Sequence, residues 1–227
     1  MAKGPLMGRK VAFTVAASVA EGYLAVPETG SGPGLLVVGR TAGLTGHVSS
    51  VVDRFAAEGF VAFAPDLYHP AADGEPFPTA VALPNVLADL VGAAHHLDGV
   101  PEFSGQLGVV GFGAGGGLAL AAAAELASAS AMVAFYPELE GLADVPWARF
   151  RGKAAIVHQS GRMDTASAAV QRRITEAGGS CRVYEYADAE PDFFNDDRPG
   201  SYHPEDARTA WARTLELLRP TLLARAA

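Results

Sequence analysis

A cluster of glycines in the middle of the chain has the form of a catalytic turn. In residues 109–120, VVGFGAGGGLAL, an apolar β-rich run enters the cluster and an alanine-rich helical pattern leaves it. A strand, a sharp turn and a helix with the motif G-x-Nuc-x-G form a nucleophile elbow, whose central residue attacks the substrate. Here the motif occupies residues 111–115 and its central residue is Gly113. The pattern therefore predicts an elbow that carries no nucleophile.

Strand and helix patterns alternate on both sides of this turn. Residues 10–17 and 21–27 are expected to form an antiparallel pair. Further strands are predicted at residues 35–39, 60–67, 106–111, 131–137, 153–159 and 181–187, and helices at 47–59, 85–97, 114–128, 165–178 and 204–223. This alternation predicts one α/β domain over residues 1–227, with a mostly parallel sheet covered by helices on both faces. Such sheets bind ligands at the carboxyl ends of their strands.

The composition excludes several classes of function. Hydrophobic residues make up 49% and charged residues 19% of the 227 residues, as in a compact globular protein. The net charge of −8 argues against binding to nucleic acid or to anionic membrane surfaces. Cys181 is the single cysteine, which excludes an internal disulfide and a multi-cysteine metal site, and we interpret it as an ordinary strand residue. We expect a cytoplasmic monomer or homodimer that acts on a small molecule and uses no cofactor or metal.

Several motifs, taken in order, resemble the dienelactone hydrolase family of the α/β-hydrolase fold. They are EGFVAFAPDLY, the glycine elbow, HQSGRMD and FFNDDRPGSYHPEDARTAWARTLELL. The likeness runs from about Gly22 to the terminal helix. It implies a thiol or hydroxyl nucleophile in the elbow, an acid and a histidine on later loops, and a glutamate at the end of the third strand.

Position by position, three of these four implied residues are replaced. The nucleophile position is Gly113, the histidine position is Pro191 and the glutamate position is Arg40, whereas the acid is kept as Asp164. Covalent acyl transfer needs a nucleophile within reach of an oriented base. The resemblance therefore implies the fold of the family without its usual chemistry.

Backbone N–H groups remain hydrogen-bond donors when the side chains around them are replaced. The N–H of Ala114 begins a helix, and the N–H of Thr41 lies on the loop that supplies the second oxyanion donor in this fold. We expect these groups, with Phe112 beside them, to bind an enolate, a carboxylate or a polarised carbonyl. Gly113 is expected to widen the pocket below them.

Each charged candidate has two interpretations. Asp164 is a general acid or base, or it caps the helix that follows it. Arg40 binds a carboxylate or phenolate of the substrate, or it forms an ion pair with Asp164 or Asp192. Asp192 supplies a carboxylate beside the lost histidine, or it is a solvated loop residue.

The histidines and tyrosines are weaker candidates. His158 ends a predicted strand and is either a catalytic or a core residue. Tyr136 and Tyr68 are candidates for pocket-lining hydroxyls, and His47 is interpreted as mostly structural. Residues 70–83, rich in proline and alanine, are expected to form a loop or lid.

Three functional hypotheses follow. The first is an enzyme that acts on a small carbonyl- or lactone-bearing secondary metabolite by non-covalent acid/base chemistry. The reaction would be a cyclisation, an isomerisation, a dehydration or a water-mediated ring opening. The catalytic candidates are Asp164, Arg40, His158 and Asp192. The second is a non-catalytic pseudoenzyme that binds a ligand or a partner protein. Its cavity is expected to be filled, for example by Phe112 or Phe193, or it should carry an apolar patch on its surface. The third is a conventional hydrolase with a displaced nucleophile, for which Ser160 beside His158 or His203 is the pair to examine.

Overall fold

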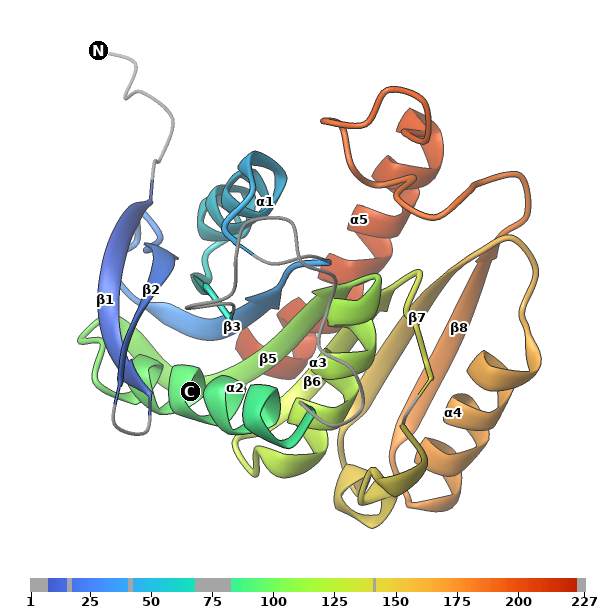
Figure 1. Cartoon of the computed structure of the whole chain (residues 1–227), viewed down its shortest axis with the longest axis horizontal. Coiled ribbons are helices and arrows are strands. Elements are labelled where there is room, and N and C mark those ends of the chain that lie inside the picture. Colours follow the sequence, from blue (N-terminus) through green and yellow to red (C-terminus); the bar gives the residue numbers. More distant parts are fainter. Residues whose placement is uncertain (1–7, 16–17, 41–42, 68–82, 141, 224–227) are drawn as a thin grey trace.

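The computed structural model describes residues 8–15, 18–40, 43–67, 83–140 and 142–223. In these ranges eight strands form one sheet with the order β1-β2-β4-β3-β5-β6-β7-β8 (Figure 1). The strands are β1 (Arg9–Val15), β2 (Ser18–Ala25), β3 (Gly32–Val38), β4 (Val61–Pro65), β5 (Phe103–Phe112), β6 (Ala129–Phe135), β7 (Ala154–Ser160) and β8 (Ser180–Tyr186). Strand β2 is antiparallel to β1 and β4, and the other neighbouring pairs are parallel.

Helices cover both faces of this sheet. They are α1 (Gly46–Ala57), α2 (Leu83–Asp98), α3 (Ala114–Glu125), α4 (Thr165–Glu176) and α5 (Pro204–Leu218), with short 3-10 segments at Leu142–Asp144 and Trp147–Phe150. Buried residues of α1 and α5 pack with one set of strand side chains, and those of α2, α3 and α4 with the other set. Leu35 and Leu36 of β3 lie in different sets because successive side chains of a strand point to opposite faces. The predicted fold class is confirmed.

The predicted elements differ from the structure mainly at their ends. The helix after the elbow ends at Glu125 instead of residue 128, and α5 ends at Leu218, where the prediction ran to residue 223. Residues Arg219–Leu223 form a π-helical turn. Pro220 lies in this turn, and proline has no N–H to continue the α-helical hydrogen bonds. Tyr68 and nearly all of the predicted loop 70–83 lie outside the described residues.

The elbow has the predicted strand–turn–helix form. Gly113 lies between β5 and α3 with φ 56° and ψ −124°, a conformation that glycine adopts without steric cost. Its N–H donates to the Phe135 carbonyl at 2.9 Å, and its carbonyl accepts from the N–H groups of Gly116 and Glu138 at 2.9 and 3.0 Å. These bonds fix the turn at the carboxyl ends of β5 and β6.

In the described ranges, no helix is both long enough and apolar enough to cross a membrane.

Candidate active site

The space above the elbow is occupied by a neighbouring side chain. A Cβ atom at Gly113 would lie 2.6 Å from Cγ and 3.0 Å from Cδ of Arg40. Arg40 follows β3, and its side chain therefore lies where the side chain of an elbow nucleophile would begin. The expectation that Gly113 widens the pocket is wrong, because the flexible arginine fills the room that glycine leaves.

Arg40 is held there by ion pairs. Its Nη1 lies 3.0 Å from Oδ2 of Asp192, and its Nη2 lies 3.4 Å from Oε1 of Glu138. Arg198 approaches the same Oδ2 of Asp192 with Nη1 at 2.8 Å. Asp192 is 4% exposed, so this carboxylate is a buried centre shared by two guanidinium groups. The structure thus gives Arg40 the ion pair with Asp192, and Asp192 is not a solvated residue.

These charges line a cavity of about 170 Å³ beside the elbow. Its walls come from the end of β3, the start of α1, the ends of β5 and β6, and the loop after β8. The lining residues are Arg40, Thr45, His47, Val48, Phe112, Tyr136, Asp192, Asn195, Asp197 and Arg198. Four sequence candidates, Arg40, Phe112, Tyr136 and Asp192, are therefore brought together. Ala114 is not among the lining residues, and Thr41 lies outside the described residues.

Tyr136 has an unusual backbone and an unpaired hydroxyl. Its φ is +37°, and its N–H donates to the His158 carbonyl at 2.6 Å. The side chain is 5% exposed, and the hydroxyl has no hydrogen-bond partner in the described part of the chain. Burial, with a smaller contribution from the Asp192 charge, raises the pKa of this phenol far above its usual range. Tyr136 therefore presents a neutral O–H group.

Backbone strain is concentrated at this cavity. Within the described ranges, Tyr136 and Asp192 (φ +71°) are the two non-glycine residues with positive φ, and both line the cavity. A bulky residue in this region of φ is a true outlier, and such strain gathers at functional sites. The conformation supports a functional role for this cavity.

His47 also contributes to the wall, although the sequence suggested a structural role. It is 6% exposed, and neither ring nitrogen makes a hydrogen bond in the described ranges. Its Nδ1 lies 3.5 Å from Oδ1 of Asp196, and its ring packs edge-on against Phe112 with centroids 5.6 Å apart. Burial lowers the pKa of His47, which favours the neutral imidazole at pH 7.

Sequence reasoning missed Arg198 altogether. The signal available was its position in the loop that follows the lost histidine, seven residues after Pro191. An arginine in such a loop is usually solvated, and here its side chain is 55% exposed even though it pairs with Asp192. Only the tertiary contact distinguishes it from other surface arginines.

Two other catalytic candidates lie away from the cavity. Asp164 is exposed and caps α4, accepting a hydrogen bond from the Ser167 N–H at 2.7 Å. His158 is fully buried, with Nδ1 2.8 Å from the Tyr186 hydroxyl and Nε2 3.0 Å from the Thr214 hydroxyl. Neither residue is among those that line the cavity.

The displaced-nucleophile hypothesis needs a hydroxyl beside a histidine. Thr214 and His158 form such a pair, but both residues are 0% exposed, so no substrate reaches them. Both nitrogens of His158 are engaged with Thr214 and Tyr186 and not with Ser160. His203 lies 3.0 Å from a carboxylate oxygen of Asp206. These contacts leave the proposed serine–histidine pairs without support.

We expect Asp164→Ala to lower the free energy of unfolding by about 1 kcal/mol, because it removes the N-cap of α4. Asp164→Asn should be close to wild type, since asparagine caps equally well. Urea denaturation of both variants measures this difference. If Asp164→Asn were as stable as wild type but lost substrate turnover, Asp164 would be catalytic and the capping interpretation would be incomplete.

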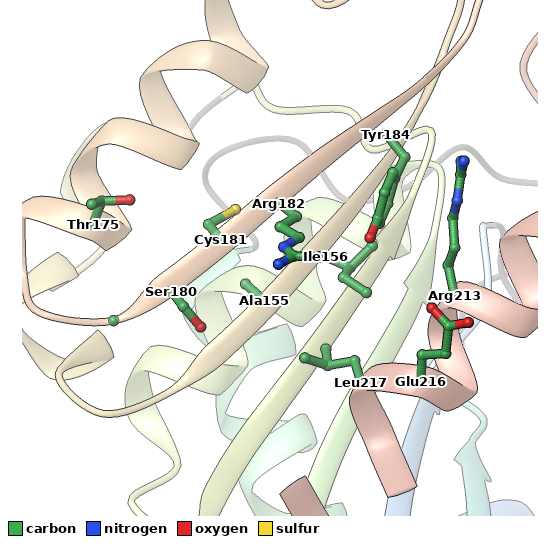
Figure 2. A pocket seen from close by; sticks show the side chains of 11 residues that line it. Ala155, Ile156, Thr175, Ser180, Cys181, Arg182, Tyr184, Arg213, Glu216 and Leu217 are labelled. Atoms are coloured by element: carbon green, nitrogen blue, oxygen red, sulfur yellow. The ribbon is translucent and has the colours of Figure 1, made fainter. Parts of the chain in front are cut away.

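A larger groove lies elsewhere, between the edge strand β8 and α5 (Figure 2). It has a volume of about 560 Å³, and Figure 2 shows Arg182, Tyr184, Arg213 and Glu216 around it. It contains none of the predicted site residues. Cys181 contributes to its wall, but burial raises the pKa of this thiol to about 12, which keeps the sulfur protonated and unreactive.

Metal binding receives no support from the described residues. In those ranges no group of three or more histidine, cysteine, aspartate or glutamate side chains is placed to hold a metal ion.

Comparison with known proteins gives a consistent result. The chain is 29% identical over 219 residues to carboxymethylenebutenolidase from Pseudomonas sp. (strain P51), covering 87% of this chain and 88% of the relative. It is 28% identical over 236 residues to protein usf from Aquifex pyrophilus, covering 95% and 100% of the two chains. Among solved structures, the chain is similar to a dienelactone hydrolase-like promiscuous phosphotriesterase P91 from metagenomic libraries. The TM-score is 0.80 at 22% identity, and the match covers 96% of this chain and 100% of that one. The two proteins therefore share a fold.

A family match covers nearly the whole chain. The profile of the dienelactone hydrolase family matches residues 20–222, which is most of the chain. The protein therefore belongs to the dienelactone hydrolase family, with the α/β-hydrolase fold.

Proposed function

We propose that this protein binds a small carbonyl- or lactone-bearing metabolite in the cavity beside the elbow and converts it by non-covalent acid/base chemistry. One observation carries the proposal: the Arg40 side chain, paired with Asp192, occupies the place of the elbow nucleophile. Membership of a hydrolase-like family supports an enzyme at this site. With glycine at position 113, the elbow itself offers no atom for an acyl-enzyme.

The cavity supplies donors for a substrate oxygen. The Tyr136 hydroxyl has no hydrogen-bond partner among the described residues, and the Arg40 guanidinium carries more N–H groups than its two ion pairs use. Hydrogen-bond donors held in place stabilise developing negative charge, such as that on the oxygen of an enolate. The substrate carbonyl would therefore lie against Tyr136 and Arg40.

Asp192 supplies the proton acceptor. Its Oδ2 receives both guanidinium groups, whereas Oδ1 has no partner in the described part of the chain. In the proposed step the C–H bond next to the carbonyl breaks, its electron pair moves into the enolate and the proton passes to Oδ1. Return of the proton to another carbon gives isomerisation, and its transfer to a departing hydroxyl gives dehydration. In water-mediated ring opening, water adds to the lactone carbonyl and its proton passes to Oδ1; the ring C–O bond then breaks and the departing oxygen takes that proton. In cyclisation, the enolate carbon bonds to a second carbonyl carbon of the substrate, whose C=O electron pair moves to oxygen and takes the proton from Oδ1.

The test is Tyr136→Phe, assayed with a panel of enolisable lactones and polyketide-like carbonyl compounds. We expect turnover to fall about 10²–10³-fold, as for the loss of one oxyanion donor. Stability should change little, because the lost hydroxyl makes no hydrogen bond within the described ranges. Tyr184→Phe is the matched control, since Tyr184 lies in the separate groove of Figure 2, and its turnover should equal wild type.

Two results would contradict the proposal. One is unchanged turnover in Tyr136→Phe. The other is rapid hydrolysis of an aryl ester with an acyl-enzyme detected by mass spectrometry, which would reveal a nucleophile outside the elbow.

A second candidate function is binding without turnover. It is favoured by the ion pairs of Arg40 with Asp192 and Glu138 and of Arg198 with Asp192, in which two positive and two negative charges balance beside the elbow. The space at the elbow is filled by Arg40 and not, as was expected, by Phe112 or Phe193. Phe112 forms part of the cavity wall, and Phe193 packs against the Tyr136 ring with centroids 5.5 Å apart. A ligand that binds wild type and Tyr136→Phe, with no product from either, would favour this candidate.

A further inference from the structure

We infer that the cavity selects an uncharged substrate about the size of a single ring and disfavours a substrate that carries a carboxylate. This inference rests on the proposed function and names the substrate class of the same site. It is argued from the charges around the cavity, from its volume and from the groups left unpaired.

Each guanidinium group in the described part of the cavity wall is already paired with a carboxylate. Arg40 is paired with Asp192 and Glu138, and Arg198 is paired with Asp192. The remaining basic group, His47, is favoured in its neutral form by burial.

The charges in the described wall of the cavity balance. Arg40 and Arg198 are positive, Asp192 and Asp197 are negative, and all four residues line the cavity. The wall therefore offers a substrate no net positive charge. A substrate carboxylate would lose its water beside Asp192 without gaining an unpaired cation, and an uncompensated charge of this kind is costly to bury.

A neutral carbonyl group, in contrast to a carboxylate, finds the groups that it needs in this cavity. It needs one or two hydrogen-bond donors and no counter-charge, and the Tyr136 hydroxyl and the spare N–H groups of Arg40 are such donors. Phe112 and Val48 provide apolar wall for the rest of the molecule. The cavity therefore offers hydrogen bonds to a polarised carbonyl oxygen and an apolar surface to the small ring that carries it.

The volume limits the size of that ring. The cavity measures about 170 Å³, and an apolar cavity of about 150 Å³ holds benzene. A single five- or six-membered ring with small substituents fits this space.

The test uses two probes that differ in charge and hardly in size: 2-pyrone-5-carboxamide and 2-pyrone-5-carboxylate. Binding to the whole protein is measured by titration calorimetry at pH 7.5. We expect wild type to bind the carboxamide about tenfold or more tightly than the carboxylate, because each guanidinium group in the described wall is already paired. This readout is independent of turnover.

Asp192→Asn is expected to reverse this preference. The substitution removes the shared carboxylate, releases Arg40 and Arg198, and should raise carboxylate affinity about tenfold or more. Asparagine suits the site, because it tolerates the positive φ of position 192 better than most residues. Glu190→Gln is the control: it removes one negative charge two residues away on an exposed side chain and should leave both affinities unchanged.

Arg198→Gln tests the same inference by removing a positive charge from the cavity wall instead of a negative one. Its side chain is 55% exposed, so we expect the variant to fold even if Asp192→Asn does not. Loss of this cation should weaken carboxylate binding further and leave carboxamide binding close to wild type.

The outcomes separate the inference from the proposed function. Equal or tighter binding of the carboxylate by wild type overturns the inference and leaves the site assignment in place. An Asp192→Asn variant that folds without gaining carboxylate affinity also overturns it. If neither probe binds wild type, both the inference and the proposed use of this cavity fail.

Discussion

Gly115→Ala is expected to lower the free energy of unfolding by about 3 kcal/mol, the upper end of the usual cost of overpacking. A Cβ atom at Gly115 would lie 2.1 Å from the Gly39 carbonyl oxygen and 2.6 Å from that of Val38. Both are backbone atoms at the end of β3, which cannot rotate away as a side chain can. The first turn of α3 would have to move off the sheet and take the elbow with it.

Thermal unfolding followed by circular dichroism measures this effect. For a chain of this length, 3 kcal/mol corresponds to a fall in Tm of about 6–12 °C. Gly200→Ala is the matched control, because a Cβ atom there meets nothing within 4 Å. Gly113→Ala should lie between the two: its positive φ is strained, but its nearest neighbour is the flexible Arg40 side chain. A Tm for Gly115→Ala equal to that of Gly200→Ala would show that β3 and α3 are farther apart than the structure places them.

Acidification is expected to destabilise the protein through His158. Burial, with a smaller contribution from the Arg213 charge, lowers the pKa of His158 to about 3 from the ordinary value of 6.5. Between these values the unfolded chain holds a proton on this residue and the folded protein does not, so stability falls as the pH falls. The contribution is fully present above pH 6.5, and about 2–3 kcal/mol of it should be lost by pH 4.5.

The variant His158→Gln isolates this contribution, because glutamine does not titrate and still offers hydrogen-bonding groups to Tyr186 or Thr214. Urea denaturation at pH 7.5, 6 and 4.5 should show the advantage of wild type over the variant shrinking toward acid pH. His203→Gln, at an exposed histidine, should change that pH profile much less. An advantage of wild type that stays constant from pH 7.5 to pH 4.5 would mean that His158 is already protonated in the fold or never changes charge.

Much of the fold was predictable from local pattern. The buried strands 35–39, 106–111 and 131–137 are short apolar runs, and the helices between strands have an apolar face or a glycine at their end. These signals depend on neighbouring residues, which is why the strands and helices were predicted correctly and only their ends shifted. The elbow was predictable for the same reason, since strand, glycine turn and helix are adjacent in the chain.

The candidate site was predictable only in part. The family resemblance indicated Arg40, Gly113 and Asp192, and the structure brings these three together. It did not indicate that Arg40 would pair with Asp192 and not with Asp164, because the three residues lie on different loops. The capping role of Asp164 was one of two local interpretations, and the observed hydrogen bond to Ser167 favours it.

The sequence by itself determined the order of the strands and helices and the turn at Gly113. It also determined the residue types at the carboxyl ends of the strands. Each of these depends on backbone preferences and on side-chain periodicity within a short segment. The tertiary structure alone decided that Arg40 fills the elbow, that Arg198 also pairs with Asp192, and that the Tyr136 hydroxyl finds no hydrogen-bond partner in the part of the chain that is described. Those outcomes depend on which charged and polar groups become neighbours after burial, and that pairing is set by the packing of loops that are distant in the chain.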